Sequence, residues 1–168
     1  MVKYLPYCLA GCLILMSQVG FTQAPYWTQV SPINQVRHSA GSTLLQDGRI
    51  LLTGGYGGTC FGGGTRTCEI YDPTLDTWDT TVADMTNCRY FHTATLLNSG
   101  KVLLAAGAFS GATAEVYDAS TNTWTSTPPM NIGRPYHTAT LLKDGRVLVV
   151  GGSGSASSSC EIYDPITN

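Results

Sequence analysis

Three histidines, His38, His92 and His137, are the first side chains of this chain that could bind a metal ion. Each opens a segment in which polar and apolar residues alternate, as in a half-buried strand, so three such strands side by side could line a channel with imidazole rings. The recurrence also favours a simpler interpretation, because a residue that every repeat carries usually serves the scaffold. We expect the histidines to hold backbone or pack between repeats, and the sequence predicts neither a metal site nor a catalytic residue.

Four cysteines follow residue 24 and are the next candidates for chemistry. A zinc site is disfavoured because the chain has no Cys-x-x-Cys, and four cysteines allow three disulfide connectivities. Cys60 and Cys68 flank a glycine-rich stretch that can fold back easily, so we predict that these two are joined. Cys160 would then pair with Cys88, with a residue beyond Asn168, or with nothing.

Charged residues recur in the same way. In each repeat an arginine precedes the first strand-like segment and a glutamate stands in the third strand-like segment. The arginines are Arg37, Arg89 and Arg134, and the glutamates are Glu69, Glu115 and Glu161. Because their number and register match, we expect three Arg–Glu pairs. A ring of arginines that binds a ligand is the alternative.

These residues belong to one repeat with a step of 46 residues, since 115 − 69 = 46 and 161 − 115 = 46. Each repeat has an alternating segment, a turn such as Lys143-Asp144-Gly145, an apolar run ending in a glycine pair, a Glu-x-Tyr-Asp segment, and a segment with tryptophan. Asp-Gly between two hydrophobic runs is a strong hairpin signal. Four short antiparallel strands per unit of this length are typical of a propeller blade, so the sequence predicts an all-β protein, a β-propeller with about three blades.

The pattern resembles the kelch repeat from about Trp27 to Asn168. The resemblance rests on glycine pairs, on the tyrosine of Glu-x-Tyr-Asp and on a spaced tryptophan: Gly54, Gly55, Gly107, Gly151, Gly152, Tyr71, Tyr117, Tyr163, Trp27, Trp78 and Trp124. Ala106 departs from it by replacing a first glycine. The resemblance implies blades over 37–83, 89–130 and 134–168, the last incomplete, with the first strand of each blade nearest the axis and the tryptophan strand outermost.

The first 24 residues have the pattern of a secretory signal peptide, with one early lysine, an apolar stretch over 5–16 and small polar residues after it. Cleavage is expected between residues 20 and 24, and an uncleaved membrane anchor is the alternative. We therefore expect a secreted, extracellular protein with no membrane association after cleavage. Only 12% of the residues are charged and the net charge is −2, which disfavours nucleic acid as a partner.

Both ends of the repeat region are incomplete. Residues 26–30, with Trp27, are expected to form an isolated N-terminal outer strand, and the chain stops before the next tryptophan, due at 124 + 46 = 170. We favour the N-terminal part of a longer propeller. The alternative is a half-propeller that closes by homodimerisation, in which each copy lends its Trp27 strand to the other. In either case open blade edges favour self-association.

The function predicted from these features is a non-catalytic scaffold that binds an extracellular protein or carbohydrate. The loop between Tyr56 and Thr67 is the best candidate contact, because it is longer than its counterparts and carries Tyr56 and Phe61 among glycines. No cofactor is expected for such a scaffold.

An enzymatic alternative comes from a second, distant resemblance. Arg134-Pro135-Tyr136 is similar to a segment of the galactose oxidase family, and Tyr136-His137 superficially matches its copper ligands. That resemblance implies a copper radical oxidase, with copper as its cofactor. The cysteine expected to crosslink the tyrosine, near Ser39 to Gly41, is missing, and Phe91-His92 has the same register as Tyr136-His137.

Overall fold

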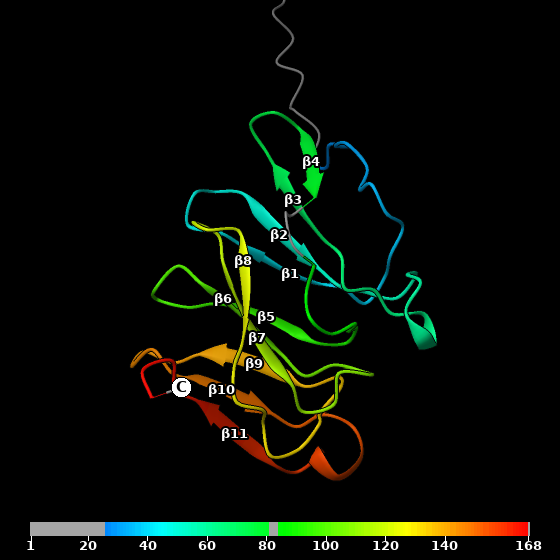
Figure 1. Ribbon diagram of the computed structural model, residues 1–168. Helices are drawn as coiled ribbons and strands as arrows, with labels where there is room; N and C mark the ends of the chain where they lie inside the picture. The colour runs from blue at the N-terminus through cyan, green and yellow to red at the C-terminus, as the bar shows by residue number, and fades with distance from the viewer. Residues whose placement is uncertain (1–25, 81–83, 168) are drawn as a thin grey trace, which may run out of the picture.

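The structure, a computed structural model, describes residues 26–80 and 84–167, which form three antiparallel sheets that we call blades 1, 2 and 3 (Figure 1). Blade 1 contains β1 (Gly41–Leu44), β2 (Ile50–Thr53), β3 (Cys68–Asp72) and β4 (Thr77–Thr80). Blade 2 contains β5 (Thr93–Leu96), β6 (Val102–Ala105), β7 (Ala114–Asp118) and β8 (Thr123–Ser126). Blade 3 contains β9 (Thr138–Leu141), β10 (Val147–Val150) and β11 (Cys160–Tyr163). The short 3-10 turns η1 (Phe61–Gly63) and η2 (Gly154–Ala156) interrupt the loops after β2 and β10.

Each blade is a meander, because every strand pairs with the next along the chain. The hairpin turns form where Asp-Gly predicted them: Gly48 and Gly145 adopt φ of 88° and 90°, which glycine reaches without steric cost. The first strands β1, β5 and β9 lie next to one another and so form the inner layer of the stack. The predicted all-β, partial-propeller architecture is therefore confirmed, with four strands in blades 1 and 2 and three described strands in blade 3.

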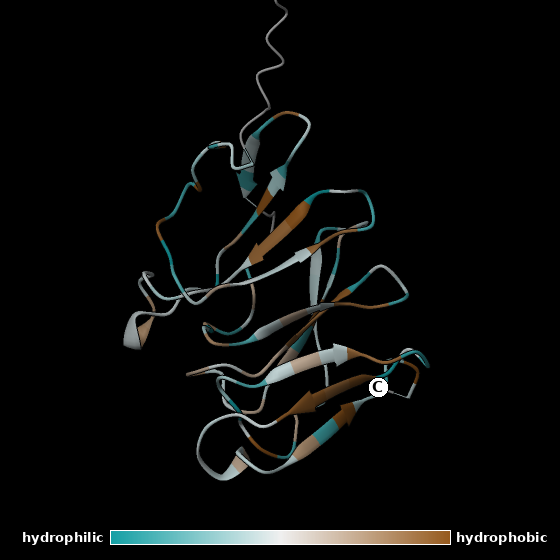
Figure 2. Cartoon of the chain, turned by 180° about the vertical axis from the view of Figure 1, so that it is seen from behind, coloured by the Kyte–Doolittle hydropathy of each residue, from teal (hydrophilic) through white to brown (hydrophobic). Residues whose placement is uncertain are grey.

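The core lies between the blades. One apolar cluster joins blades 1 and 2, where Leu51, Val102 and Leu104 are fully buried, and a second cluster joins blades 2 and 3 around Val147 and Val149. Figure 2 shows the second strands β2 and β10 as hydrophobic. Burying one such aliphatic side chain contributes about 1.5–3 kcal/mol, so neighbouring blades stabilise one another.

Backbone bends after the second strands bring neighbouring segments into close contact. Gly107 has φ 110°, and a Cβ there would meet the carbonyl oxygen of Tyr90 at 2.9 Å. Ala106, where the other repeats have glycine, is held at φ 49°. An alanine in this region costs about 1 kcal/mol relative to glycine, so the middle repeat keeps the bend against its local preference.

The predicted strand over 26–30 is not formed. Its five residues are exposed, including Trp27 at 92%, and the structure assigns them no strand. They lie at the blade 1 end of the stack, while the unpaired outer edge of blade 3 lies at the other end (Figure 1). Within residues 26–80 and 84–167, the segment 26–30 therefore joins no blade.

The predicted signal peptide, residues 1–24, lies outside the described residues. Within 26–80 and 84–167, no helix is long and apolar enough to cross a membrane.

Candidate functional site: an aromatic rim

The recurring arginines and glutamates form the three expected pairs. Their N–O distances are 2.8 Å for Arg37–Glu69, 2.5 Å for Arg89–Glu115 and 2.6 Å for Arg134–Glu161. Each arginine also donates to two backbone carbonyls of its own blade, and each glutamate accepts from two backbone N–H groups of the segment that leads into that blade. The pairs are therefore structural clamps, and the alternative of a ligand-binding arginine ring is wrong.

Ionisation of the middle pair reflects its surroundings. Burial opposes the charge of Glu115, but the backbone N–H of Thr86 and the guanidinium of Arg89 outweigh it and lower the pKa of the carboxyl group. Burial likewise lowers the pKa of Arg89, and its Nε is buried without a hydrogen-bond partner. Both side chains of the pair are charged, because each stabilises the charge of the other.

The tyrosines and tryptophans of the repeat also serve the scaffold. Tyr71 and Trp78 pack with ring centroids 4.9 Å apart, and Tyr117 and Trp124 with centroids 4.8 Å apart. The aspartate after each tyrosine accepts backbone hydrogen bonds in the following turn, as expected for Asx turns. Tyr163, the third tyrosine, has no tryptophan beside it in the described part of the chain.

The histidines are not equivalent, contrary to the prediction. His92 and His137 are buried just before β5 and β9, whereas His38 lies two positions earlier in its repeat, and the half-buried Ala40 stands just before β1. His38 is exposed and stacks on Tyr56 with centroids 4.9 Å apart. The two buried rings do hold neighbouring blades together, as expected, because Nε2 of His92 lies 2.8 Å from the Thr53 hydroxyl of blade 1.

Copper does not fit at Tyr136-His137. The His137 Nδ1–H donates to the carbonyl of Arg134 at 2.7 Å, which leaves Nε2 to accept from the Thr93 hydroxyl at 2.8 Å. Both ring nitrogens are therefore occupied. Within 26–80 and 84–167, no group of three or more His, Cys, Asp or Glu residues is placed to hold a metal ion.

The disulfide prediction was wrong: Cys60 is bonded to Cys88, and Cys68 is free. Cys68 begins β3 and points into the cluster between blades 1 and 2, where burial raises the pKa of its thiol to about 12. Cys60 instead lies in the loop after β2, next to the segment that leads into blade 2. Cys88 belongs to that segment, and the two Cα atoms are 6.4 Å apart. By chain entropy this loop closure contributes about 3–4 kcal/mol.

Next to this disulfide, aromatic rings from all three blades form one surface, which we call the rim. Its members are His38, Tyr56, Phe61, Tyr90, Phe91, Phe109 and Tyr136. The rings touch in sequence, from His38 and Tyr56 to Tyr90, then to Phe91 and Tyr136 on one branch and to Phe109 and Phe61 on the other. Phe91 and Tyr136 stack with centroids 3.9 Å apart.

Most of the rim is exposed, while Tyr90 and Phe91 at its centre are half-buried, and its backbone is strained at three positions. Phe61 is 92% exposed and Tyr136 is 61% exposed. Phe91, Phe109 and Tyr136 have φ of 55°, 64° and 66°, a left-handed conformation that bulky residues rarely adopt. Ser39 and Gly57 hold the same registers in blade 1 with φ of 56° and 125°, so the bends belong to the repeat, which here places bulky rings on them.

Tyr56 and Phe61, the two contact residues that the sequence suggested, both lie on this rim. Sequence reasoning missed Tyr90, Phe91 and Phe109 as site residues and considered Tyr136 only as a copper ligand. A signal was present, because each arginine that precedes a first strand is followed within two residues by an aromatic in blades 2 and 3. Only the fold shows that these aromatics meet those of the loops after β2 and β6.

Comparison with known proteins agrees with this architecture. The family model described as "Kelch motif" matches residues 38–85 and 134–168. Among solved structures, "Structure of YjhT" aligns with a TM-score of 0.66 at 17% identity and covers 79% of this chain. The alignment covers 49% of that protein, so the chain spans about half the length of the structure that it matches. No curated protein matches this sequence. With the repeat, the blades and the motif matches in agreement, the chain belongs to the kelch-motif family.

Proposed function

We propose that this chain is a secreted, non-catalytic binding module whose rim contacts a protein partner. The single observation that carries the proposal is the continuous run of aromatic rings across three blades, in which Tyr56, Phe61, Phe109 and Tyr136 are exposed. Soluble proteins seldom expose such a contiguous surface unless it binds something. Aromatic residues are enriched in the buried centres of protein interfaces, where a few of them supply most of the binding energy.

The chemistry of the rim favours protein over carbohydrate. The loops that follow the second strands, 54–67, 106–113 and 151–159, contain no Asp, Glu, Asn or Gln. Recognition of sugar hydroxyls needs placed polar side chains, whereas Phe61 and Phe109 present hydrocarbon rings without a hydrogen-bonding group. Phe61, almost fully exposed, has the form of an anchor that enters a pocket of a partner.

A carbohydrate is the second candidate, and a specific observation favours it. Tyr56 and Tyr136 are both exposed at the rim, and each combines a flat ring with a hydroxyl. An exposed tyrosine can stack against the apolar face of a sugar and hydrogen-bond to its edge.

Two features support an extracellular location. The pattern of residues 1–24 is that of a signal peptide, and the Cys60–Cys88 disulfide beside the rim is a bond that persists in oxidising compartments. The same disulfide fixes the loop that carries Phe61 against the entry to blade 2, which reduces the entropy cost of ordering the rim on binding.

The test is binding of the labelled protein to the surface of cells from its own source, compared with a double variant, Phe61→Ser with Phe109→Ser. A matched control is Leu75→Ser, which removes an exposed apolar side chain far from the rim. We expect the double variant to lose at least tenfold in affinity and the control to bind normally. Protease treatment of the cells should abolish binding and glycosidase treatment should not. Equal binding by both variants would refute the role of the rim, and loss on glycosidase treatment alone would identify the ligand as carbohydrate.

A further inference from the structure

A disulfide connects two parts of the rim. Cys60 lies in the loop after β2 and directly precedes Phe61, whose ring is 92% exposed. Its partner Cys88 stands two residues before Tyr90, in the segment that leads into blade 2. The bond therefore ties the part of the rim that blade 1 carries to the part that blade 2 carries.

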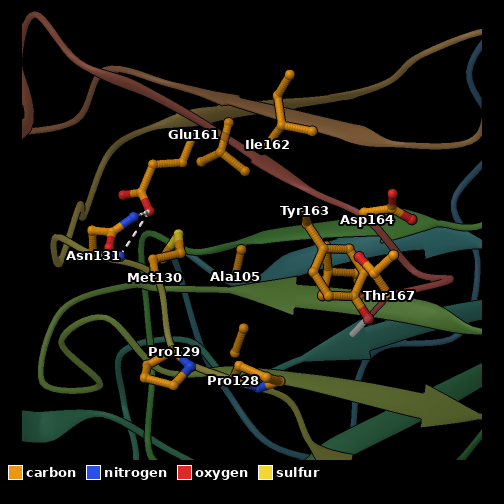
Figure 3. Close-up of a pocket in the computed structure, with 13 residues that line it drawn as sticks. Ala105, Pro128, Pro129, Met130, Asn131, Glu161, Ile162, Tyr163, Asp164 and Thr167 are labelled. Atoms are coloured by element: carbon orange, nitrogen blue, oxygen red, sulfur yellow. Dashed lines mark hydrogen bonds between the residues drawn. The ribbon is translucent and has the colours of Figure 1, made fainter.

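This bond is not needed to build a blade. Cys88 shares its register with Gly133, because each directly precedes the arginine of its repeat. In blade 3 the clamp forms without a disulfide at this position, since Glu161 accepts hydrogen bonds from the backbone and the side chain of Asn131 (Figure 3). Neither half of the disulfide belongs to the apolar clusters between the blades. The blades therefore keep their clamps and their cores when the bond opens.

The loop on the other side of the bond is largely self-contained. We call residues 57–64 the rim loop. The Gly58 N–H donates to the carbonyl of Gly63 at 3.0 Å, and the Cys60 N–H donates to the carbonyl of Gly64 at 3.1 Å. In the described part of the chain, no hydrogen bond joins the rim loop to blade 2. The disulfide and contacts between the loop and aromatic rings are therefore what hold it against blade 2.

The composition of the rim loop makes its order costly. Five of its eight residues are glycine, and Gly62 and Gly63 adopt φ of 77° and 80°. Glycine loses more conformational freedom on ordering than any other residue. In the ordered loop a Cβ on Gly62 would overlap the ring of Phe109, and one on Gly63 would lie 2.6 Å from the ring of Tyr56. The loop therefore lies directly on two rings of the rim, and these contacts are lost when it leaves.

The disulfide outweighs the ring contact that holds the same loop. Phe61 and Phe109 meet edge to face with their centroids 6.2 Å apart, and a pair of this kind shifts an equilibrium by about tenfold at most. Cys60 and Cys88 are 28 residues apart, and in the chain-entropy model closing a loop of that length shifts an equilibrium by about a hundredfold or more. The bond therefore decides whether the loop stays in place.

We propose that reduction of the Cys60–Cys88 disulfide by a dithiol releases the rim loop and switches the rim from a binding form to an open form. The proposal rests on the proposed function, because it regulates the same surface. One thiolate of the dithiol attacks a sulfur of the bond, the other cysteine leaves as a thiolate, and the second thiol of the reductant then displaces the protein from the mixed disulfide. Two electrons and two protons pass in total from the dithiol to the protein. The reductant ends as its disulfide, and the protein ends with two thiols.

Amide hydrogen exchange tests the release of the loop without a partner. The protein used is Cys160→Ser, because Cys160 is the exposed free thiol of the described residues and Cys68 is buried. After treatment with millimolar dithiothreitol the amide of Gly58 should exchange at least tenfold faster, while that of Leu104 in the buried strand β6 should not change. Removal of the reductant and reoxidation should restore the slow rate. The matched control is Phe61→Ser with the bond intact, which should show at most a third of that increase, and an equal increase in the two would overturn the proposal.

Binding to cells tests the regulation itself. Cys60→Ser with Cys88→Ser reproduces the open form without a reductant, and it should lose at least tenfold in affinity for the same cells while circular dichroism shows unchanged β structure. The proposal is overturned if the bond resists dithiothreitol until the blades unfold, or if reduction leaves the exchange of the loop unchanged. It is also overturned if this variant binds normally while Phe61→Ser with Phe109→Ser does not, a result that leaves the proposed function standing. If the phenylalanine variant binds normally as well, the proposed function fails and the switch fails with it.

Discussion

The buried pair Arg89–Glu115 gives the sharpest test of the scaffold. Both side chains are 0% exposed, and Oε1 of Glu115 lies 2.5 Å from Nη2 of Arg89. Glu115→Ala would remove the partner of a buried guanidinium and the acceptor of two N–H groups, those of Thr86 and Asn87. Breaking a buried pair from one side costs about 3–5 kcal/mol, and we expect a loss of unfolding free energy in that range.

Blade 3 contains the matched control. Glu161 makes the same contacts with Arg134 and with two backbone N–H groups, but 16% of its side chain is exposed. Water can therefore solvate part of what Glu161→Ala leaves behind, and the expected loss is about 1–2 kcal/mol. Urea unfolding monitored by tryptophan fluorescence measures both variants. Equal losses, or a loss below about 1 kcal/mol for Glu115→Ala, would refute the view that burial makes this clamp essential.

Replacing both residues of the pair tests whether the charges alone or also the hydrogen bonds to backbone groups stabilise the fold. Many buried ion pairs can be exchanged for apolar residues at little cost. This one also satisfies backbone groups, since Arg89 donates to the carbonyls of Ala106 and Thr113 and Glu115 accepts from two N–H groups. Arg89→Met with Glu115→Leu should therefore stay at least about 2 kcal/mol less stable than the unmodified protein, because each orphaned buried group costs about 1–3 kcal/mol. Full recovery in the double variant would show that the charges alone matter.

Three further outcomes can be measured. Burial lowers the pKa of His92 to about 3, so between pH 6.5 and 3 the unfolded chain binds a proton that the native state does not. The free energy of unfolding should therefore fall by about 1.4 kcal/mol per pH unit on acidification. In His92→Gln this slope should flatten over pH 6.5–5. The exposed thiol of Cys160 should react with a maleimide within minutes, while Cys68, whose thiol pKa is raised to about 12 by burial, should react only on unfolding; mass spectrometry of the native protein separates the two. Trp124→Ala should cost about 3 kcal/mol, the lower end of the range for aromatic truncation, because the ring is half-buried against the cluster that contains Tyr117; a loss under 1 kcal/mol in urea unfolding would contradict that packing.

The blades could be predicted because the same sequence pattern occurs in three repeats. A Glu-x-Tyr-Asp segment with a fixed step, an Asp-Gly turn and an apolar run each have a local physical meaning, and their agreement across repeats leaves few alternatives. The Arg–Glu pairs followed from the same logic, since a matching number and register imply a matching contact. Sequence periodicity therefore gave the elements and the clamps without knowledge of the packing.

The disulfide could not be found from spacing, because spacing does not say where a side chain points. Cys68 shares its register with Ala114, a small buried residue of blade 2, and this was the available sign that its thiol faces the core. The sequence also contained a sign that the three histidines do not occupy equivalent positions. His92 and His137 both stand three residues after an arginine, whereas His38 stands one residue after Arg37.

Most of the rim escaped prediction for the opposite reason, since the residue type at its positions varies from one repeat to the next: Phe91 and Tyr136 share their register with Ser39, and Tyr56 shares its register with Ala108. Phe61 and Phe109 lie in loops of different length, and Tyr56 and Tyr136 belong to different positions of their repeats. A residue that recurs in every blade is explained by the blade, so recurrence carries information about the scaffold. The bends at Phe91, Phe109 and Tyr136 recur at Ser39 and Gly57 of blade 1, so the repeat explains the backbone conformation but not the exposed aromatic rings placed on it. The exposed aromatic residues of the rim stand at positions whose residue type differs between repeats, so the repeat alone does not account for them, and the proposed binding function rests on these residues.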